Sequence, residues 1–218
     1  MQSMIERVRA HLSTLGITLQ FEANPPATQA DVDEAQERLQ LSLPASYVSF
    51  VTQFANGFDL AWTSPKDKVF GTFTMEPIAS SVEGLLGMRD WRLYSEKAAR
   101  QYGFPYTDDP ELAMRTNARM HHWLPLVRIA NGDFLSIDLN EDHFGQAIFD
   151  KHDWLDGGSG DNGSPLADDW PTFFEAWSRV CFVHPKSYYW PNILQDTGVE
   201  WSSPEFLNRF RLGKDSIR

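Results

Sequence analysis

The chain has 218 residues, of which 42% are hydrophobic, and it carries a formal net charge of −11 at pH 7. This composition is typical of a globular protein and excludes an intrinsically disordered one, and the absence of any run of eighteen apolar residues predicts no membrane-spanning helix. Charged residues near the N-terminus interrupt any secretory signal, and a single cysteine, Cys181, excludes an internal disulfide, so we expect a cytoplasmic protein.

Two amphipathic helices are predicted at the start of the chain. The first covers residues 4–15 and ends at Gly16. The second begins at Thr28, whose side chain is a good N-cap with Asp31 in a capping-box position. Its remaining charged residues are left mostly to water. The residues expected to face inward in the two helices are Ile5, Val8, Leu12, Leu15, Val32, Ala35 and Leu39.

A third helix is predicted to follow at once. Pro44 suits its first turn, because the N–H that proline lacks would be unpaired there anyway. We expect Asn56-Gly57 to end this helix with left-handed residues. Its buried stripe has the spacing i, i+3, i+4 and i+7 and consists of Tyr47, Phe50, Val51 and Phe54.

The middle of the chain changes to a strand pattern. Alternating apolar residues predict strands over 58–62 and 69–75, followed by a helix over 82–101 and a loop with one short helix over 102–122. The strongest hairpin signal is Asn131-Gly132 between two alternating segments, which predicts a two-residue type I′ turn.

The last part of the chain mixes strand, loop and helix signals. A strand is predicted over 147–152, a flexible acidic loop over 156–165, and a helix that Asp169 caps with Pro171 at its first position. Residues 183–218 are aromatic but irregular, and we expect them to pack on the rest of the protein.

Taken in order, these segments resemble the SUKH superfamily. Residues 28–59 are similar to its opening, which has an acidic helix, an "LP..Y..F" helix and a terminal "NG". Its central hairpin is matched by WLPLVRIANGDFLSIDL, its next strand by AIFDKHDW and its closing helix by ADDWPTFFEAWSRV. The resemblance covers residues 22–182 and implies an α+β fold, with a mostly antiparallel sheet of hairpins, or meander, packed against helices. We therefore expect one domain over 1–182 with a C-terminal extension over 183–218.

Acidic residues are concentrated between Asn131 and Asp169, where ten acids and one base give a net charge of −9. Such a field repels nucleic acid and attracts basic partners. A solvated, solubilising surface is the alternative interpretation of the same charge.

Few residues suggest catalysis or metal binding. Asp138 and Asp150 each end a predicted strand, and a pair of carboxylates is what glycoside hydrolysis requires, but acids before turns are common. His121-His122 would point to opposite faces of a strand, and the usual zinc spacings are absent. Calcium in the 156–165 loop is a minor alternative. The sequence therefore predicts no catalytic residue, no cofactor and no metal.

The resemblance implies a binding protein. Bacterial members of the superfamily are largely immunity proteins, which bind and neutralise a cognate polymorphic toxin that is often a nuclease with a basic cleft. The alternatives are a regulatory scaffold of the fungal cell-wall assembly regulator type and a small-molecule or carbohydrate enzyme that uses the hairpin carboxylates. We expect no direct binding of nucleic acid or membrane, and the oligomeric state stays open between monomer and weak dimer. The predicted partner contacts are Asp142, Asp150, Asp153, Asp156, Asp161, Tyr188, Tyr189 and Trp190.

Overall fold

The computed structural model describes most of the chain. The described residues are 1–102, 118–129, 132–150, 163–184, 194–195, 198–199, 209–210 and 212, with side chains for all of these except 91–102, 194–195 and 198–199.

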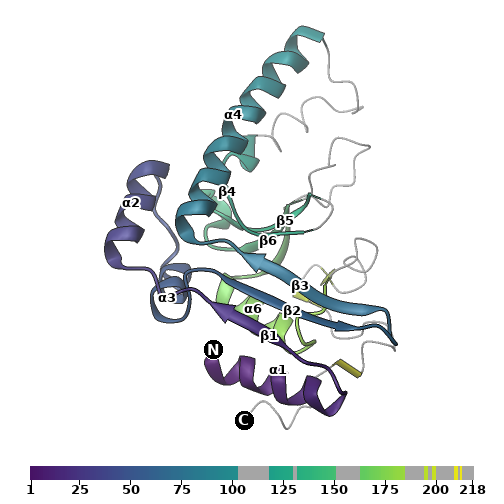
Figure 1. Ribbon diagram of the computed structural model, residues 1–218. Coiled ribbons are helices and arrows are strands. Elements are labelled where there is room, and N and C mark those ends of the chain that lie inside the picture. The colour runs from purple at the N-terminus through teal and green to yellow at the C-terminus, as the bar shows by residue number, and fades with distance from the viewer. Residues whose placement is uncertain are drawn as a thin grey trace.

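A seven-stranded sheet forms the centre of the fold, and its strands lie side by side in chain order (Figure 1). Every neighbouring pair is antiparallel, so the sheet is a meander. The α+β fold expected from the sequence is confirmed. The strands are β1 (Gln20–Ala23), β2 (Phe58–Ser64), β3 (Val69–Met75), β4 (Trp123–Arg128), β5 (Phe134–Asp138), β6 (Ala147–Asp150) and β7 (Ser164–Ala167), with a separate short pair β8 (Leu194–Gln195) and β9 (Gly198–Val199).

Helices pack around this sheet, and the long helix α4 extends well beyond it (Figure 1). Alternate residues of β2 and β3 are buried, so one face of these strands is internal and the other faces solvent. Among the described residues, no helix has both the length and the apolar character that a membrane crossing requires. The helices are α1 (Gln2–Thr14), α2 (Gln29–Leu39), α3 (Ala45–Gln53), α4 (Ile78–Tyr102), α6 (Trp170–Ser178) and the 3₁₀ turn η1 (Glu141–His143).

The core is built from aromatic rings that join α3, α6 and the internal face of β2 and β3. The ring of Phe174 lies 5.3 Å from that of Phe50 and 5.4 Å from that of Phe58. Trp177 stacks on Phe73 at 4.3 Å. Each fully buried side chain of this kind contributes roughly 1.5–3 kcal/mol, so this cluster fixes α6 against the sheet.

Several local signals act as the sequence predicts. The side chain of Thr28 accepts a hydrogen bond from the backbone N–H of Asp31, and the Asp31 carboxylate accepts one from the backbone N–H of Thr28, so both halves of the capping box are present. Gly16 has φ +73° and follows the end of α1. Most residues predicted to face inward in the first two helices are buried: Ile5, Val8, Leu12, Val32, Ala35 and Leu39. The exception is Leu15, which follows the last residue of α1 and is only partly buried.

The turns are predicted less well. Pro44 is the N-cap of α3 and not its first helical residue, and Pro171 is the second residue of α6. Asn56-Gly57 does not end α3, which stops at Gln53. Asn56 instead accepts a hydrogen bond from the backbone N–H of Ile78 at 2.8 Å, so it caps the start of α4.

The β4–β5 hairpin is confirmed, but its turn differs from the prediction. The backbone N–H of Ile129 donates to the carbonyl of Asp133 at 2.7 Å, so three residues separate this pair where a type I′ turn would have two. Gly132 has φ +98°, the left-handed conformation that glycine adopts in such longer hairpins. Ala130 and Asn131 themselves lie outside the described residues.

The sequence does not predict β7, because its first two residues, Ser164 and Pro165, fall within the predicted acidic loop 156–165. β7 is an edge strand of the sheet, and proline is tolerated at an edge because no neighbour needs its N–H. The rest of that loop, and residues 151–152 of the predicted strand 147–152, lie outside the described residues.

Three described residues near the C-terminus contact elements from distant parts of the chain. The buried ring of Phe210 stacks on Trp62 at 5.2 Å. The Nε2 atom of His11 donates to the carbonyl of Arg209 at 2.9 Å, and the Arg209 side chain pairs with Asp67. The backbone N–H of Leu212 donates to the carbonyl of Arg179 at 2.9 Å. These contacts hold Arg209, Phe210 and Leu212 against α1, β2 with its turn to β3, and the end of α6.

Candidate functional site

The two hairpin carboxylates lie at opposite ends of neighbouring strands. Asp150 pairs with Phe134 at the start of β5, whereas Asp138 is the last residue of β5. Four residues of extended chain separate these positions by roughly 13 Å. Glycosidase carboxylates lie about 5–9.5 Å apart, so the geometry does not suit an acid–base pair.

Asp138 has a structural role. It is fully buried, and its Oδ1 atom accepts a hydrogen bond from the backbone N–H of Asn140 at 2.9 Å. Its Oδ2 atom pairs with Arg119 at 3.3 Å. These contacts hold the chain as it leaves β5.

Much of the acidic segment 131–169 is not on the surface. Asp133, Asp138 and Asp150 are buried, and Asp169 caps α6 by accepting a hydrogen bond from the backbone N–H of Thr172 at 2.8 Å. Of the predicted contacts, Asp150 is 2% exposed and is therefore not accessible to a partner, whereas Asp142 is exposed on η1. The other predicted contacts lie outside the described residues: Asp153, Asp156, Asp161, Tyr188, Tyr189 and Trp190.

An exposed aromatic side chain stands next to Asp142. Phe144 is 47% exposed and borders a shallow hollow that also involves Leu41, Leu139 and His122. Burial, with a smaller contribution from Arg89, lowers the pKa of His122, so its ring is neutral at pH 7. An apolar centre beside the acids Glu141 and Asp142 has the composition of a small protein-binding patch.

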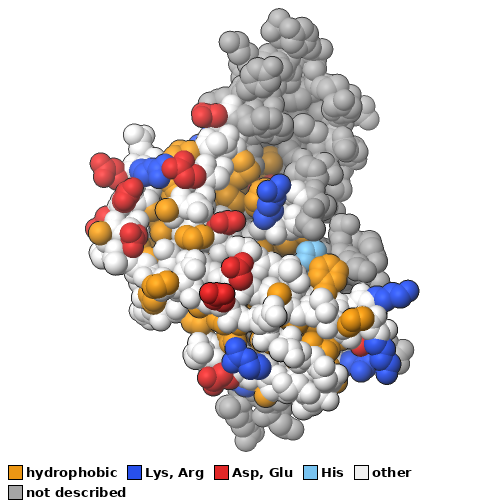
Figure 2. All heavy atoms as spheres, viewed as in Figure 1, with side chains coloured by type: hydrophobic (Ala, Val, Ile, Leu, Met, Phe, Trp, Pro, Cys, Tyr) orange, Lys and Arg blue, Asp and Glu red, His pale blue; other side chains and the backbone are white. Residues whose placement is uncertain are grey.

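A larger group of acids, exposed except for the half-buried Glu76, lies on other elements. Figure 2 shows acidic side chains gathered over α2 and over the solvent-facing side of the first strands. We call this the acidic face. Arg38 lies on α2 beside these acids and pairs with Glu83 at 2.6 Å. The eight acids of the acidic face are Glu22, Asp31, Asp33, Glu34, Glu37, Asp59, Glu76 and Glu83.

Strand register brings the acids of the sheet together. Glu22 on β1 is directly opposite Asp59 on β2, and Asp59 is directly opposite Thr74 on β3. The Thr74 hydroxyl donates to the Asp59 carboxylate at 2.5 Å. Like charges directly opposite each other destabilise a sheet, so this pair is kept at some cost in stability.

Only part of the acidic face can be recognised from the sequence. The charged residues of α2 are visible as the outward face of an amphipathic helix. In contrast, Glu22 and Asp59 are far apart in the chain, and only the pairing of β1 with β2 brings them onto one surface.

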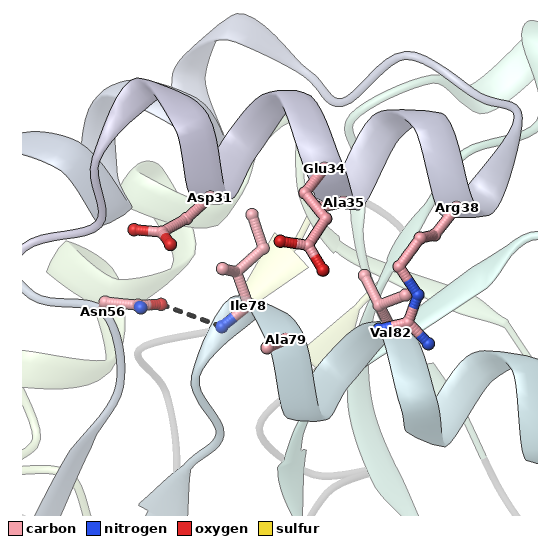
Figure 3. Close-up of a pocket in the computed structure, with 8 residues that line it drawn as sticks. All are labelled: Asp31, Glu34, Ala35, Arg38, Asn56, Ile78, Ala79 and Val82. Atoms are coloured by element: carbon pink, nitrogen blue, oxygen red, sulfur yellow. Dashed lines mark hydrogen bonds between the residues drawn. The ribbon is translucent and has the colours of Figure 1, made fainter.

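A groove runs between α2 and α4 at the border of the acidic face (Figure 3). Its polar side chains include Asp31 and Glu34, and its floor is apolar. We call it the α2–α4 groove, and it is lined by Asp31, Glu34, Ala35, Arg38, Asn56, Ile78, Ala79 and Val82.

Within the described ranges, no group of three or more His, Cys, Asp or Glu side chains is placed to hold a metal ion. The prediction that the protein needs no metal or cofactor concerns the whole chain and stays a prediction.

Comparison with known families gives one match. The family model described as SMI1 / KNR4 family (SUKH-1) matches residues 26–176, which is more than half of the chain. The match includes α2, α3, the strands β2 to β7 and most of α6. A comparison with curated proteins finds no match to this chain.

Proposed function

Because the chain belongs to the SMI1 / KNR4 family (SUKH-1), we propose that it is a non-enzymatic binding protein that neutralises a cognate toxin domain of basic character. The observation that carries this proposal is the acidic face, which gathers eight acids and in which Arg38 is already paired with Glu83. A toxin that acts on nucleic acid needs a basic cleft to hold phosphates, and the acidic face is complementary to such a cleft.

Most acids of the acidic face lie on helices and strands. Its acids lie on α2, on β1 and β2, in the connection between β3 and α4, and in the first turns of α4. The N-terminus of α2 is closed by a complete capping box. A surface of this kind needs little rearrangement on binding, so little conformational entropy is lost. Its charge can also raise the association rate by about 10–10³-fold at low salt.

The proposed partner surface extends beyond the acidic face. Asp142 on η1 and Phe144, which immediately follows η1, offer a second contact. Asp153, Asp156 and Asp161 together with Tyr188–Trp190 remain predicted contacts. We further propose that the protein acts in the cytoplasm, as a monomer or weak dimer, and does not bind nucleic acid itself, since its net charge of −11 repels phosphates.

The test uses an inactivated toxin domain encoded beside the gene for this protein. Association is measured by stopped flow at low and high salt for a double variant, Glu37→Gln with Asp59→Asn. The matched control is Glu6→Gln with Asp168→Asn, which removes the same charge from exposed positions outside the acidic face. We expect several-fold slower association for the first variant at low salt, no comparable effect in the control, and convergence of the rates at high salt.

Two outcomes would contradict the proposal. Equal rates for both double variants would mean that the acidic face only keeps the protein soluble. Tight binding that leaves the active toxin fully toxic in co-expressing cells would favour the regulatory scaffold alternative.

A further inference from the structure

The α2–α4 groove combines an apolar floor with carboxylates on one side. Its floor is formed by Ile78, Ala79 and Val82 of α4 together with Ala35 of α2. Figure 3 shows the side chains of Asp31 and Glu34 extending from α2 toward α4. Residues three apart on a helix share one side, so the two carboxylates can act on one ligand.

The charges around the groove do not cancel. Arg38 also lines the groove, and its guanidinium is paired with Glu83. The three carboxylates Asp31, Glu34 and Glu83 exceed this one positive charge, so the net charge of the four groups is −2. Hydrogen bonds from the backbone and side chain of Thr28 lower the pKa of Asp31, which keeps this carboxylate ionised. Among the described residues, Glu34 has no hydrogen bond or ion pair of its own.

The N-terminus of α4 also faces the groove and has the opposite sign. A helix N-terminus carries about half a positive charge, and the backbone N–H of Ile78 is already bonded to the side chain of Asn56. Two full carboxylate charges outweigh this half charge. The groove therefore favours a cation.

The size of the groove restricts the ligand. Its volume is about 60 Å³, which is far below the roughly 300–1,000 Å³ of pockets that bind drug-sized molecules. It exceeds the space of about 10–15 Å³ that one water needs. A groove of this size accepts the end of one side chain.

We propose that the α2–α4 groove binds an arginine side chain of the protein partner. A planar guanidinium has five N–H donors and can bridge two carboxylates, whereas an ammonium acts as a point charge. A guanidinium is also less strongly hydrated than an ammonium, so it suits an apolar floor. This inference rests on the proposed function in one respect, namely that the partner is a protein.

The experiment uses ethylguanidinium as a probe of the groove in the full-length protein. Chemical shifts of backbone amides are followed by NMR while the probe is added, with ethylammonium as the comparison ligand. We expect saturable shifts at Glu34, Ala79 and Val82 with a Kd of about 1–10 mM, which is typical of a ligand with so few atoms. Ethylammonium should bind more weakly at the same amides.

Two variants and a matched control separate specific binding from general attraction. Glu34→Gln should raise the Kd for ethylguanidinium about tenfold, because a charge-assisted hydrogen bond is lost. Ala79→Leu should abolish the shifts by filling the groove. Glu37→Gln removes the same charge from the same helix but does not line the groove, and it should leave the Kd within about twofold.

Other results would overturn the proposal. Shifts spread over the whole acidic face, or equal effects of Glu34→Gln and Glu37→Gln, would mean that the probe is only a counterion. Equal binding of ethylammonium would contradict the choice of arginine. Because this titration needs no partner, its failure leaves the toxin-binding result unaffected, and a toxin that does not bind leaves the groove result unaffected.

Discussion

Glu22 and Asp59 face each other across the β1–β2 pair, on the side of the sheet that is open to solvent. Two carboxylates in this position repel each other, and the Thr74 hydroxyl relieves only one of them. A sheet selected for stability alone would place opposite charges there. The pair therefore favours a role in binding a positive partner.

Replacing Asp59 with Asn should make the free protein more stable. The amide removes the repulsion with Glu22 and keeps an oxygen that can accept from Thr74, so we expect a gain of roughly 0.2–1 kcal/mol at low salt. Urea unfolding gives the free energy. In 1 M salt the Debye length is about 3 Å and the gain should shrink. An equal gain at both salt concentrations would point to a cause other than repulsion.

Two neighbouring aromatic residues of α3 should differ in their effect on stability. Phe50 is 1% exposed and contacts the rings of Phe54, Phe174 and Trp170, whereas Phe54 is only partly buried. Phe50→Ala should therefore lower the free energy of unfolding by about 3–5 kcal/mol, and Phe54→Ala by clearly less. Chemical denaturation of both variants measures this difference. A loss below 1 kcal/mol for Phe50→Ala would contradict its burial against α6.

Two glycines should respond in opposite ways to the same substitution. A Cβ atom at Gly71 would lie 2.3 Å from Nε1 of Trp62 and 2.5 Å from the carbonyl of Phe182, so Gly71→Ala should destabilise the protein by about 1–3 kcal/mol or more. Gly87 lies within α4 with nothing near its Cβ position, and Gly87→Ala should stabilise by roughly 0.5–1 kcal/mol. Thermal unfolding of the two variants measures both signs. If Gly71→Ala unfolds at the wild-type temperature, the close packing of Trp62 is wrong.

Cys181 should be unreactive in the folded protein and should make stability depend on pH. Burial raises the pKa of its thiol to about 12, compared with an ordinary value near 9. As the pH rises, the Cys181 thiol loses its proton in the unfolded chain before it does so in the folded protein. The contribution of the buried thiol to the free energy of unfolding is therefore fully present below about pH 9. It then falls by roughly 1.4 kcal/mol per pH unit between about pH 9 and 12.

The comparison with Cys181→Ala isolates this effect, because burial also raises the pKa of the Tyr47 phenol. The variant should lose stability less steeply above pH 9 than the wild type. Thiol labelling at pH 8 should be slow in the native protein and rapid in urea. Rapid labelling of the native protein would show that the region around Cys181 opens readily.

Phe144 should matter for binding and not for folding. With 47% of its surface exposed, Phe144→Ser should change the free energy of unfolding by no more than about 0.5 kcal/mol. If the hollow beside η1 belongs to the partner surface, the same variant should dissociate faster from the toxin domain, as measured by surface plasmon resonance. The nearby exposed variant Asp142→Asn serves as the polar control, and unchanged dissociation for Phe144→Ser would exclude the hollow from the interface.

Features that depend on nearby residues could be predicted from the sequence. The capping box of Thr28, the buried stripe of α3 and the β4–β5 hairpin each follow from residues within one element. Predictions of turn residues were wrong where a contact with another element determines the conformation. Asn56 lies shortly after α3 in the chain, but its side chain caps the start of α4.

The candidate site was harder to predict, because it depends on register and burial. The sequence showed ten acids between Asn131 and Asp169, but it could not show that Asp133, Asp138 and Asp150 are internal. In the same way, no local pattern indicates that Glu22 meets Asp59, since 36 residues of helix and turn separate them. A count of charges along a chain therefore says little about where the charges lie in space.

The contacts of residues 209–212 have a consequence for how the protein is made. His11 and Arg209 are 198 positions apart, and the ring that stacks on Trp62 comes from the same late segment. During synthesis on the ribosome, α1, β2 and the β2–β3 turn are complete long before Phe210 is added to the chain. Trp62 therefore lacks the ring that stacks on it in the finished protein. Contacts of such long range are slow to form, because a large loop must close first. The stacking of Phe210 on Trp62 is therefore among the last contacts of the fold that can form during synthesis.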